Sequence, residues 1–123
     1  MSEPPSDCLF CRMVAGEIPA DVVHETDRTL AFRDINPQAP THVLVVPKQH
    51  HATLGALAAA DPALTAELVA AAHAVAVQEG LATEDGPEPG YRLVANTGPA
   101  AGQTVHHLHL HVLGGRPMTW PPG

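Results

Sequence analysis

Three histidines, His107, His109 and His111, alternate with apolar residues near the end of the chain. In a β-strand, side chains two residues apart lie on the same face, about 7 Å from one another. We therefore predict a strand over 105–113 in which the three imidazoles line one accessible face. The opposite face is expected to pack on the core through the intervening residues, which are Leu108, Leu110 and Val112.

Aligned imidazoles suit two kinds of chemistry, and their spacing alone does not distinguish them. Neutral imidazole is a good ligand for Zn²⁺. It is also a nucleophile near pH 7, so one ring can attack phosphorus while its neighbours handle charge and protons. A third interpretation, solvated histidines on a strand face, is disfavoured because strict alternation of three histidines is improbable by chance.

The loop before these histidines, 96–104, favours chemistry on phosphorus. Its small residues let backbone N–H groups approach an anion. The side chains of Asn96, Gln103 and Thr104 supply further hydrogen-bond donors. A loop of this kind is usually only a turn, but ahead of three aligned imidazoles it indicates a phosphate cradle.

Cys8 and Cys11 have the Cys-x-x-Cys spacing of a metal site, but one such pair supplies only two ligands. The evidence for a thioredoxin-like redox function is weak, because no strand precedes the pair. Packing of two small residues in a helix is the plain alternative. His50 and His51 both satisfy the spacing for a third ligand.

The hydrophobic pattern and the turn residues predict an α+β fold of about five strands, one long helix and one short helix. Strands that follow one another directly are expected to pair antiparallel. Asp61 followed by Pro62 is a strong start for the long helix. The expected elements are a helix over 8–15, strands over 22–25, 29–32, 42–46, 91–95 and 105–113, and a helix from 62 to 79 with apolar residues Leu64, Leu68, Ala71, Ala72 and Val75 on one face.

Length and composition limit the classes of function. The 123 residues suffice for one domain, expected over 7–123 after a disordered N-terminal segment, 1–6. A net charge of −7 and 3% aromatic residues argue against a nucleic-acid partner. No apolar run approaches the roughly 20 residues of a membrane span, and the N-terminus lacks a secretory signal. We therefore expect a cytoplasmic protein with no membrane partner.

The segment 107–113 resembles the signature of the histidine-triad (HIT) superfamily, in which three histidines alternate with apolar residues. The ending Trp-Pro-Pro-Gly, 120–123, is similar to the Hint-like branch in particular. The resemblance extends over 7–123, with supporting matches at 18–19, 31–35, 37–42, 46–48, 102–105 and 114–116. It implies a HIT-like α+β fold in which two protomers join their sheets into one homodimer; the open edges of a five-stranded sheet also favour such pairing.

This resemblance implies a hydrolase of purine nucleoside phosphoramidates or related conjugates of AMP and GMP. His109 is then the nucleophile that forms a covalent nucleotidyl-histidine, and His111 contacts the phosphate and favours departure of the leaving group. His42 supports the nucleophile, and Thr104 acts on the leaving-group side. Mg²⁺ is not expected to be essential, because oriented donors neutralise the developing charge.

The resemblance also assigns binding residues. Asp34 is expected to accept hydrogen bonds from the ribose hydroxyls. The α-phosphate and leaving-group side are assigned to Asn96, Gly102, Gln103 and Thr104. The slot for the base is assigned to Leu9, Phe10, Met13, Ile18, Phe32 and Leu44, with Ile35 among the substrate-binding residues.

Some bacterial proteins of this superfamily have a similar Cys-x-x-Cys pair and carry structural zinc on such residues. The resemblance implies a zinc ion on Cys8, Cys11, His50 and His107, where the motif register favours His50 over His51. The remaining histidines, His24, His51, His73 and His106, are expected on the surface or in packing. The alternatives are a dinucleoside polyphosphate hydrolase, a nucleotide-binding scaffold with incidental hydrolysis, and a zinc-binding protein without a nucleotide.

Overall fold

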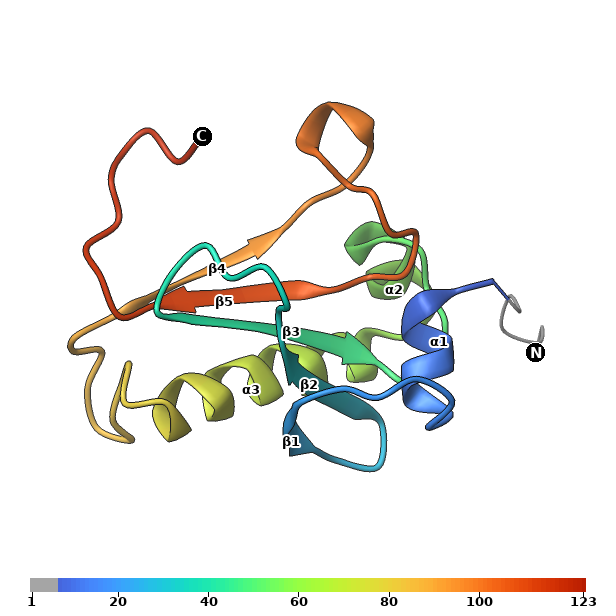
Figure 1. Ribbon diagram of the computed structural model, residues 1–123, viewed down its shortest axis with the longest axis horizontal. Helices are drawn as coiled ribbons and strands as arrows, with labels where there is room; N and C mark the ends of the chain where they lie inside the picture. Colours follow the sequence, from blue (N-terminus) through green and yellow to red (C-terminus); the bar gives the residue numbers. More distant parts are fainter. Residues whose placement is uncertain (1–6) are drawn as a thin grey trace.

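The computed structural model describes residues 7–123, and the segment expected to be disordered, 1–6, lies outside them. Its centre is a five-stranded antiparallel sheet with the strand order β1-β2-β3-β5-β4 (Figure 1). The α+β prediction is thereby confirmed. The elements are α1 (Leu9–Val14), β1 (Val22–Glu25), β2 (Thr29–Arg33), β3 (Thr41–Pro47), α2 (Leu54–Ala60), α3 (Pro62–Gln78), β4 (Tyr91–Ala95), the 3₁₀ turn η1 (Pro99–Ala101) and β5 (Leu110–Gly114).

Different helices cover the two faces of the sheet. Along β3, Val43 and Val45 belong to the core beneath α3, whereas Leu44 and Val46 pack with Phe10 of α1. This alternation follows from the period of two in a strand. Figure 1 shows α3 running along the sheet and α1 near the end of β3. The five residues predicted for the apolar face of α3 are all buried.

The strand expected over 105–113 is shorter than predicted. β5 begins at Leu110, whose partner on β3 is Val45. Two residues further along this register, Leu108 would face Pro47, which has no N–H to donate to a ladder. The N–H of Leu108 instead donates to the carbonyl of His51, 2.7 Å away. His107 and His109 therefore lie in an irregular segment before the strand, and only His111 lies within it.

The structure adds one short helix, α2, that the sequence prediction omitted. The Thr53 hydroxyl caps it by accepting the N–H of Ala56 at 3.1 Å. Asp61 ends α2 and caps α3, accepting the N–H of Leu64 at 3.0 Å. A hydroxyl cap followed by an Ala-rich run is the signal that would have identified α2. None of the helices within 7–123 combines the length and hydrophobicity that a bilayer crossing requires.

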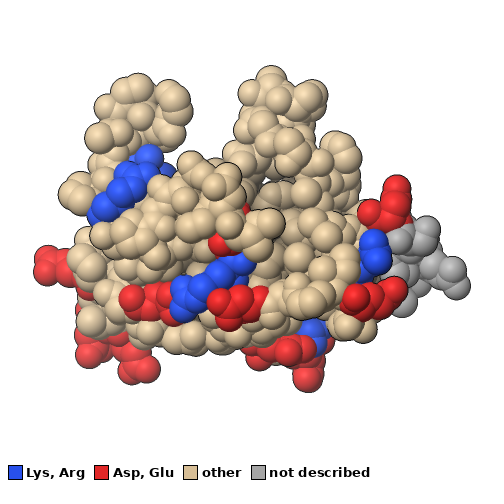
Figure 2. All heavy atoms as spheres, in the orientation of Figure 1, with Lys and Arg blue, Asp and Glu red and all other residues tan. Residues whose placement is uncertain are grey.

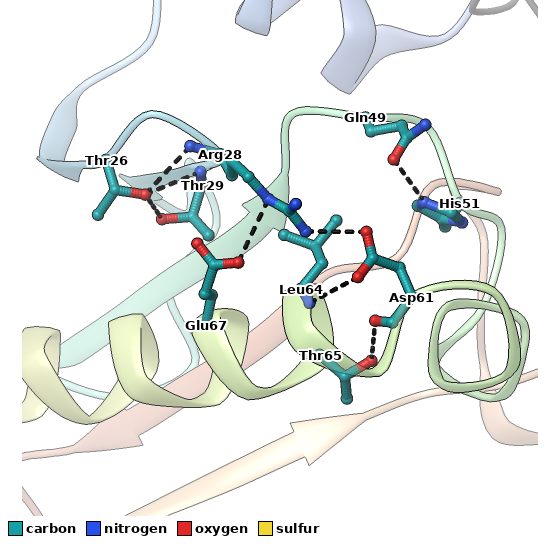
Figure 3. A network of polar contacts seen from close by, with 9 residues as sticks. All are labelled: Thr26, Arg28, Thr29, Gln49, His51, Asp61, Leu64, Thr65 and Glu67. Carbon is teal, nitrogen blue, oxygen red and sulfur yellow. Dashed lines mark hydrogen bonds and ion pairs between the residues drawn. The ribbon is translucent and has the colours of Figure 1, made fainter. Parts of the chain in front are cut away.

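A polar network joins the first hairpin to α3 (Figure 3). Arg28, in the turn between β1 and β2, donates to Asp61 at 2.9 Å and lies 3.3 Å from Glu67. The hydroxyls of Thr26 and Thr29 share a 2.7 Å hydrogen bond within the same turn. The pKa of Asp61 is lowered chiefly by the backbone N–H of Leu64 and also by Arg28. The network fixes β1 and β2 against the helix, and so fixes one wall of the site described next.

Candidate active site

A pair of imidazoles lies on the sheet face opposite α3. His42 of β3 and His111 of β5 are diagonal neighbours on adjacent strands. His111 pairs with Leu44 and His42 pairs with Leu113, so the two histidines are offset by two residues. Their side chains lean together, and His42 Nε2 is 2.9 Å from His111 Nδ1. The ring of His109 lies next to that of His111, with 5.0 Å between the ring centroids.

The backbone fixes the protons of this pair. The N–H of Gln38 donates to His42 Nδ1 at 3.0 Å, so a neutral His42 carries its proton on Nε2 and donates it to His111 Nδ1. A neutral His111 then carries its proton on Nε2. Burial, with smaller contributions from the neighbouring His109 and His42, lowers the pKa of His111 to about 4. Burial also lowers the pKa of His42. Both rings are therefore neutral at pH 7.

His109 is oriented by a backbone carbonyl. Its Nδ1 is 2.8 Å from the carbonyl oxygen of His107. A carbonyl only accepts, so Nδ1 carries the proton and Nε2 keeps its lone pair. The ring packs edge-to-face with that of Phe10, with centroids 5.1 Å apart. This arrangement leaves Nε2 as the one nitrogen of His109 that can attack a substrate.

Two polar side chains complete the imidazole cluster. Asp34 accepts the N–H of Asn36 at 2.8 Å and places its other oxygen 3.5 Å from His42 Nε2. The amide nitrogen Nδ2 of Asn96 lies 3.4 Å from His111 Nε2. Because that nitrogen of His111 carries a proton, a hydrogen bond between the two side chains requires the Asn96 amide turned by 180°, so that its oxygen accepts.

Asp34, His42 and His111 place their ligand atoms within 4.8 Å of one another, which is the spacing of a metal site. The hydrogen bond to His42 Nδ1 argues against a metal here. It keeps the proton on Nε2, the nitrogen that a metal would need, and a cation cannot bind a nitrogen that carries a proton. We therefore interpret these three residues as a group without a metal, in which His42 Nε2–H donates to His111 Nδ1 and the carboxylate of Asp34 lies beside the donor.

Two glycines and the side chain of Gln103 fix the conformation of the loop between β4 and β5. Gly98 and Gly102 adopt positive φ values of 83° and 88°, which favour glycine. The buried side chain of Gln103 accepts the N–H of Gly98 and donates to the carbonyls of Ala52 and Val105. Gln103 therefore shapes the loop with its side chain, whereas Thr104 is exposed and Asn96 is half-buried.

An apolar slot of about 480 Å³ opens beside the imidazoles, between α1 and strands β2 and β3. Ile18, assigned to it from the sequence, is not among its lining residues. Ile35 stands at its rim with 98% of its surface exposed. The lining residues expected from the sequence are Leu9, Phe10, Met13, Phe32, Asp34, Ile35 and Leu44, and those it missed are Pro19, Ala20, Asp21, Arg33 and Val105. The nearby Ile18-Pro19 turn was the available signal for the first three of the missed residues.

A second cluster brings together the four residues that the sequence assigned to zinc. The ligand atoms of Cys8, Cys11, His50 and His107 all lie within 4.8 Å of one another. His107 Nδ1 is 3.1 Å from His50 Nδ1, 3.3 Å from Cys8 Sγ and 3.4 Å from Cys11 Sγ. His107 was expected on an accessible face, but its exposure is 0%. Its Nε2 donates to the carbonyl of Pro47 at 2.8 Å, which leaves Nδ1 as a ligand.

The donor set fits a four-coordinate cation. Bonds of about 2.0–2.3 Å to nitrogen and sulfur in a tetrahedron place the ligand atoms roughly 3.3–3.8 Å apart, close to the spacings observed. Burial raises the pKa of Cys11 to about 12 and lowers the pKa of His107 to about 4. Both pKa shifts arise because the two side chains are buried without a nearby charge that offsets the cost of desolvation. A bound cation would supply that charge.

The remaining four histidines stay outside both clusters, as expected. His73 bonds to the hydroxyl of Tyr91 at 2.8 Å, and His51 contacts the side chain of Gln49 at 3.2 Å. His106 is exposed, and His24 is half-buried. These contacts are local and give none of the four a place beside the slot.

An α+β domain with an antiparallel sheet, imidazoles on the face opposite α3 and an apolar slot beside them is the fold and site shared by one class of protein. The model of the HIT domain family matches residues 15–118. The chain belongs to the HIT family. The match begins after α1, so Cys8 and Cys11 lie outside the part that defines the family.

Relatives and solved structures agree with this membership. A HIT family hydrolase from Legionella pneumophila has a TM-score of 0.87 and 53% identity, over 95% of this chain and 100% of that one. A 14 kDa zinc-binding protein of Zea mays is 48% identical over 96% of this chain and 89% of its own length. The adenylylsulfatase HINT1 of Arabidopsis thaliana is 42% identical over 100% of this chain and 82% of its own length.

Proposed function

We propose that the protein hydrolyses purine nucleoside monophosphate conjugates of the adenosine phosphoramidate type through a covalent nucleotidyl-histidine. The observation that carries the proposal is the His109 ring, whose Nδ1–H is held by the His107 carbonyl at 2.8 Å so that the Nε2 lone pair is available. The ring lies between the apolar slot and the His42–His111 pair. The Legionella hydrolase and the Arabidopsis adenylylsulfatase support the class of reaction.

The reaction takes place in two displacements. The base lies in the slot, Asp34 accepts from the ribose, and the loop 96–104 donates to the phosphate. His109 Nε2 forms a bond to phosphorus while the bond to the leaving group breaks. His111 Nε2–H donates a hydrogen bond to the leaving group, which takes up its proton from water. The Nε2–H of His42 holds the His111 ring in the tautomer that makes this possible, and the Thr104 hydroxyl donates on the same side. Water then attacks phosphorus and releases the nucleoside monophosphate and a free His109.

The neutral state of the pair matters for this scheme. A proton on both rings would place positive charges together and remove the acceptor that His111 Nδ1 offers to His42. The lowered pKa values of His42 and His111 keep the pair uncharged at pH 7. Oriented hydrogen-bond donors, and not Mg²⁺, balance the charge on the phosphoryl oxygens.

The test is steady-state hydrolysis of a fluorogenic adenosine phosphoramidate. We expect release of the amine without added Mg²⁺ and no loss of rate when Mg²⁺ is chelated. Diadenosine polyphosphate offered at equal concentration is expected to react more slowly. Faster cleavage of the polyphosphate would favour the alternative hydrolase, and binding of AMP without any turnover would favour a nucleotide-binding scaffold.

We propose that the second cluster holds one structural zinc ion. With Cys8, Cys11, His50 and His107 as ligands the coordination shell is closed, which is typical of structural and not catalytic sites. Zinc would keep the two thiols deprotonated and join α1 to the segment before β5. The zinc-binding relative from Zea mays supports this choice of metal.

We also propose a homodimer in which the two sheets join. β4 pairs with β5 on one side only, so its other edge offers backbone groups to a partner. Leu93 of β4 and Trp120 are exposed, and Figure 2 shows few charged side chains around β4, η1 and the C-terminal segment. Light scattering at micromolar concentration should give twice the 12.9 kDa protomer mass; the mass of one protomer would contradict the proposal.

A further inference from the structure

The short helix α1 takes part in both the proposed zinc site and the apolar slot. The zinc cluster consists of Cys8, Cys11, His50 and His107. Its two cysteines lie in α1 or directly precede it. The residues of α1 that line the slot are Leu9, Phe10 and Met13. The cysteines and the slot residues are interleaved along 8–13, so one helix serves both sites.

Hydrogen bonds attach α1 to the rest of the chain through its two thiols. Within the described part of the chain, every hydrogen bond that joins the segment 7–17 to another segment has Cys8 Sγ or Cys11 Sγ as one of its atoms. The partners are His50 and His107, and the backbone hydrogen bonds of 7–17 are internal to it. A helix of six residues is not stable by itself. The position of α1 therefore depends on the thiols and on its apolar contacts.

Phe10 makes the central apolar contact of α1. It is buried, and its ring packs edge-to-face with those of His107 and His109, with centroids 5.9 and 5.1 Å apart. A third edge-to-face contact, at 5.5 Å, joins it to Phe32, which also lines the slot. One ring thus touches a residue of the zinc cluster, the proposed nucleophile and a wall of the slot.

We infer that zinc and the nucleotide bind cooperatively, because each holds α1 in the position that the other requires, with Phe10 as the contact that joins the two sites. The inference rests on the proposed function and adds regulation to it. Joined through zinc to His50 and His107, the thiols fix the helical wall of the slot. A base in the slot contacts that wall and so keeps both thiols near the histidines. Linkage requires the two effects to be equal in size.

Calorimetric titration of the full chain with AMP, in zinc-loaded and in chelator-treated form, tests the inference. The titrations are made below the thermal midpoint of the metal-free chain, where circular dichroism shows that both forms are folded. We expect AMP to bind about tenfold more weakly without zinc, as is typical of coupled sites, and added zinc should restore the affinity. Saturating AMP should strengthen zinc binding by the same factor in competition with a chromophoric chelator, after subtraction of zinc binding to AMP alone.

Two variants of α1 separate this coupling from general stabilisation. Phe10→Leu keeps all four ligands and an apolar side chain but removes the ring that touches His107 and His109. Its zinc content should stay near one equivalent, while the ratio of the two AMP affinities should fall to about threefold or less. Arg12→Ala is the matched control, because Arg12 is exposed and belongs neither to the slot nor to the zinc cluster. It should keep the wild-type ratio.

The outcomes distinguish the inference from the proposals on which it rests. Equal affinities for AMP with and without zinc in the folded protein, or a ratio unchanged in Phe10→Leu, would overturn the inference alone. If the metal-free chain does not fold, the rate of zinc release to the chelator decides. AMP should slow that release by about fivefold or more in the wild type and by less than about twofold in Phe10→Leu, and equal slowing in both would overturn the inference. Failure of the zinc-loaded protein to bind AMP would instead overturn the proposed function, and absence of zinc from the purified protein would overturn the proposed metal site.

Discussion

Replacing His109 by Asn should lower the turnover of a nucleoside phosphoramidate by on the order of 10⁴-fold or more, while AMP still binds. The substitution removes the Nε2 lone pair, and no other imidazole of the cluster can substitute for it. His111 Nδ1 accepts from His42, and His107 is directed toward Cys8, Cys11 and His50. Asp34 and Asn96 are unchanged, which is why we expect binding to survive. Steady-state hydrolysis and calorimetric binding measure the two effects separately.

Mass spectrometry of quenched reactions adds a direct test of the covalent step. A nucleotidyl adduct is expected on the peptide that contains residues 105–113 and should be absent from His109→Asn. His106→Asn is the matched control, because His106 is an exposed neighbour outside the imidazole cluster, and its turnover should stay near wild type. His111→Asn should cost less than His109→Asn and depend on the leaving group. Full activity in His109→Asn, or an adduct that persists in it, would show the assignment to be wrong.

Removing the metal should have the second large effect, this time on stability. Protein purified without chelator is expected to contain about one equivalent of zinc. An ion at 1,000 times its dissociation constant stabilises the folded chain by about 4 kcal/mol, so chelation should lower the thermal midpoint by roughly 10 °C or more. Zinc added back should restore it. Elemental analysis and thermal unfolding followed by circular dichroism provide the measurements.

Two adjacent histidines supply a control for the metal prediction. His50→Ala removes a ligand and should reduce both the zinc content and the midpoint. His51→Ala leaves all four ligands in place and should preserve both, since the contact of His51 with Leu108 uses its backbone carbonyl. A metal-free preparation whose midpoint does not change when zinc is added would contradict the site.

Local patterns predicted those parts of the fold that depend on nearest neighbours in the sequence. Asp61-Pro62 located the start of α3, and the alternation of Leu108, Leu110 and Val112 with the histidines located the buried side of that segment. The start of β5 was missed because it depends on Pro47, 63 residues before Leu110, which cannot extend the ladder. No pattern within residues 105–113 contains that information.

The candidate sites likewise contain features that the sequence predicts and features that depend on contacts made only in the folded chain. Residue types and family register brought Cys8, Cys11, His50 and His107 together correctly, since metal ligands must be near one another whatever the fold between them. The tautomers of His42 and His109 could not be predicted, because they are set by the N–H of Gln38 and the carbonyl of His107.

The carbonyl of His107 has a chemical consequence for the product of the first displacement. A free imidazole exchanges its proton between two nitrogens and reacts at either, so its phosphorylated forms are a mixture of regioisomers. In His109 the acceptor at Nδ1 belongs to the backbone, and no rotation of the ring presents that nitrogen to phosphorus without breaking the contact. The nucleotidyl adduct should therefore be a single regioisomer, joined through Nε2.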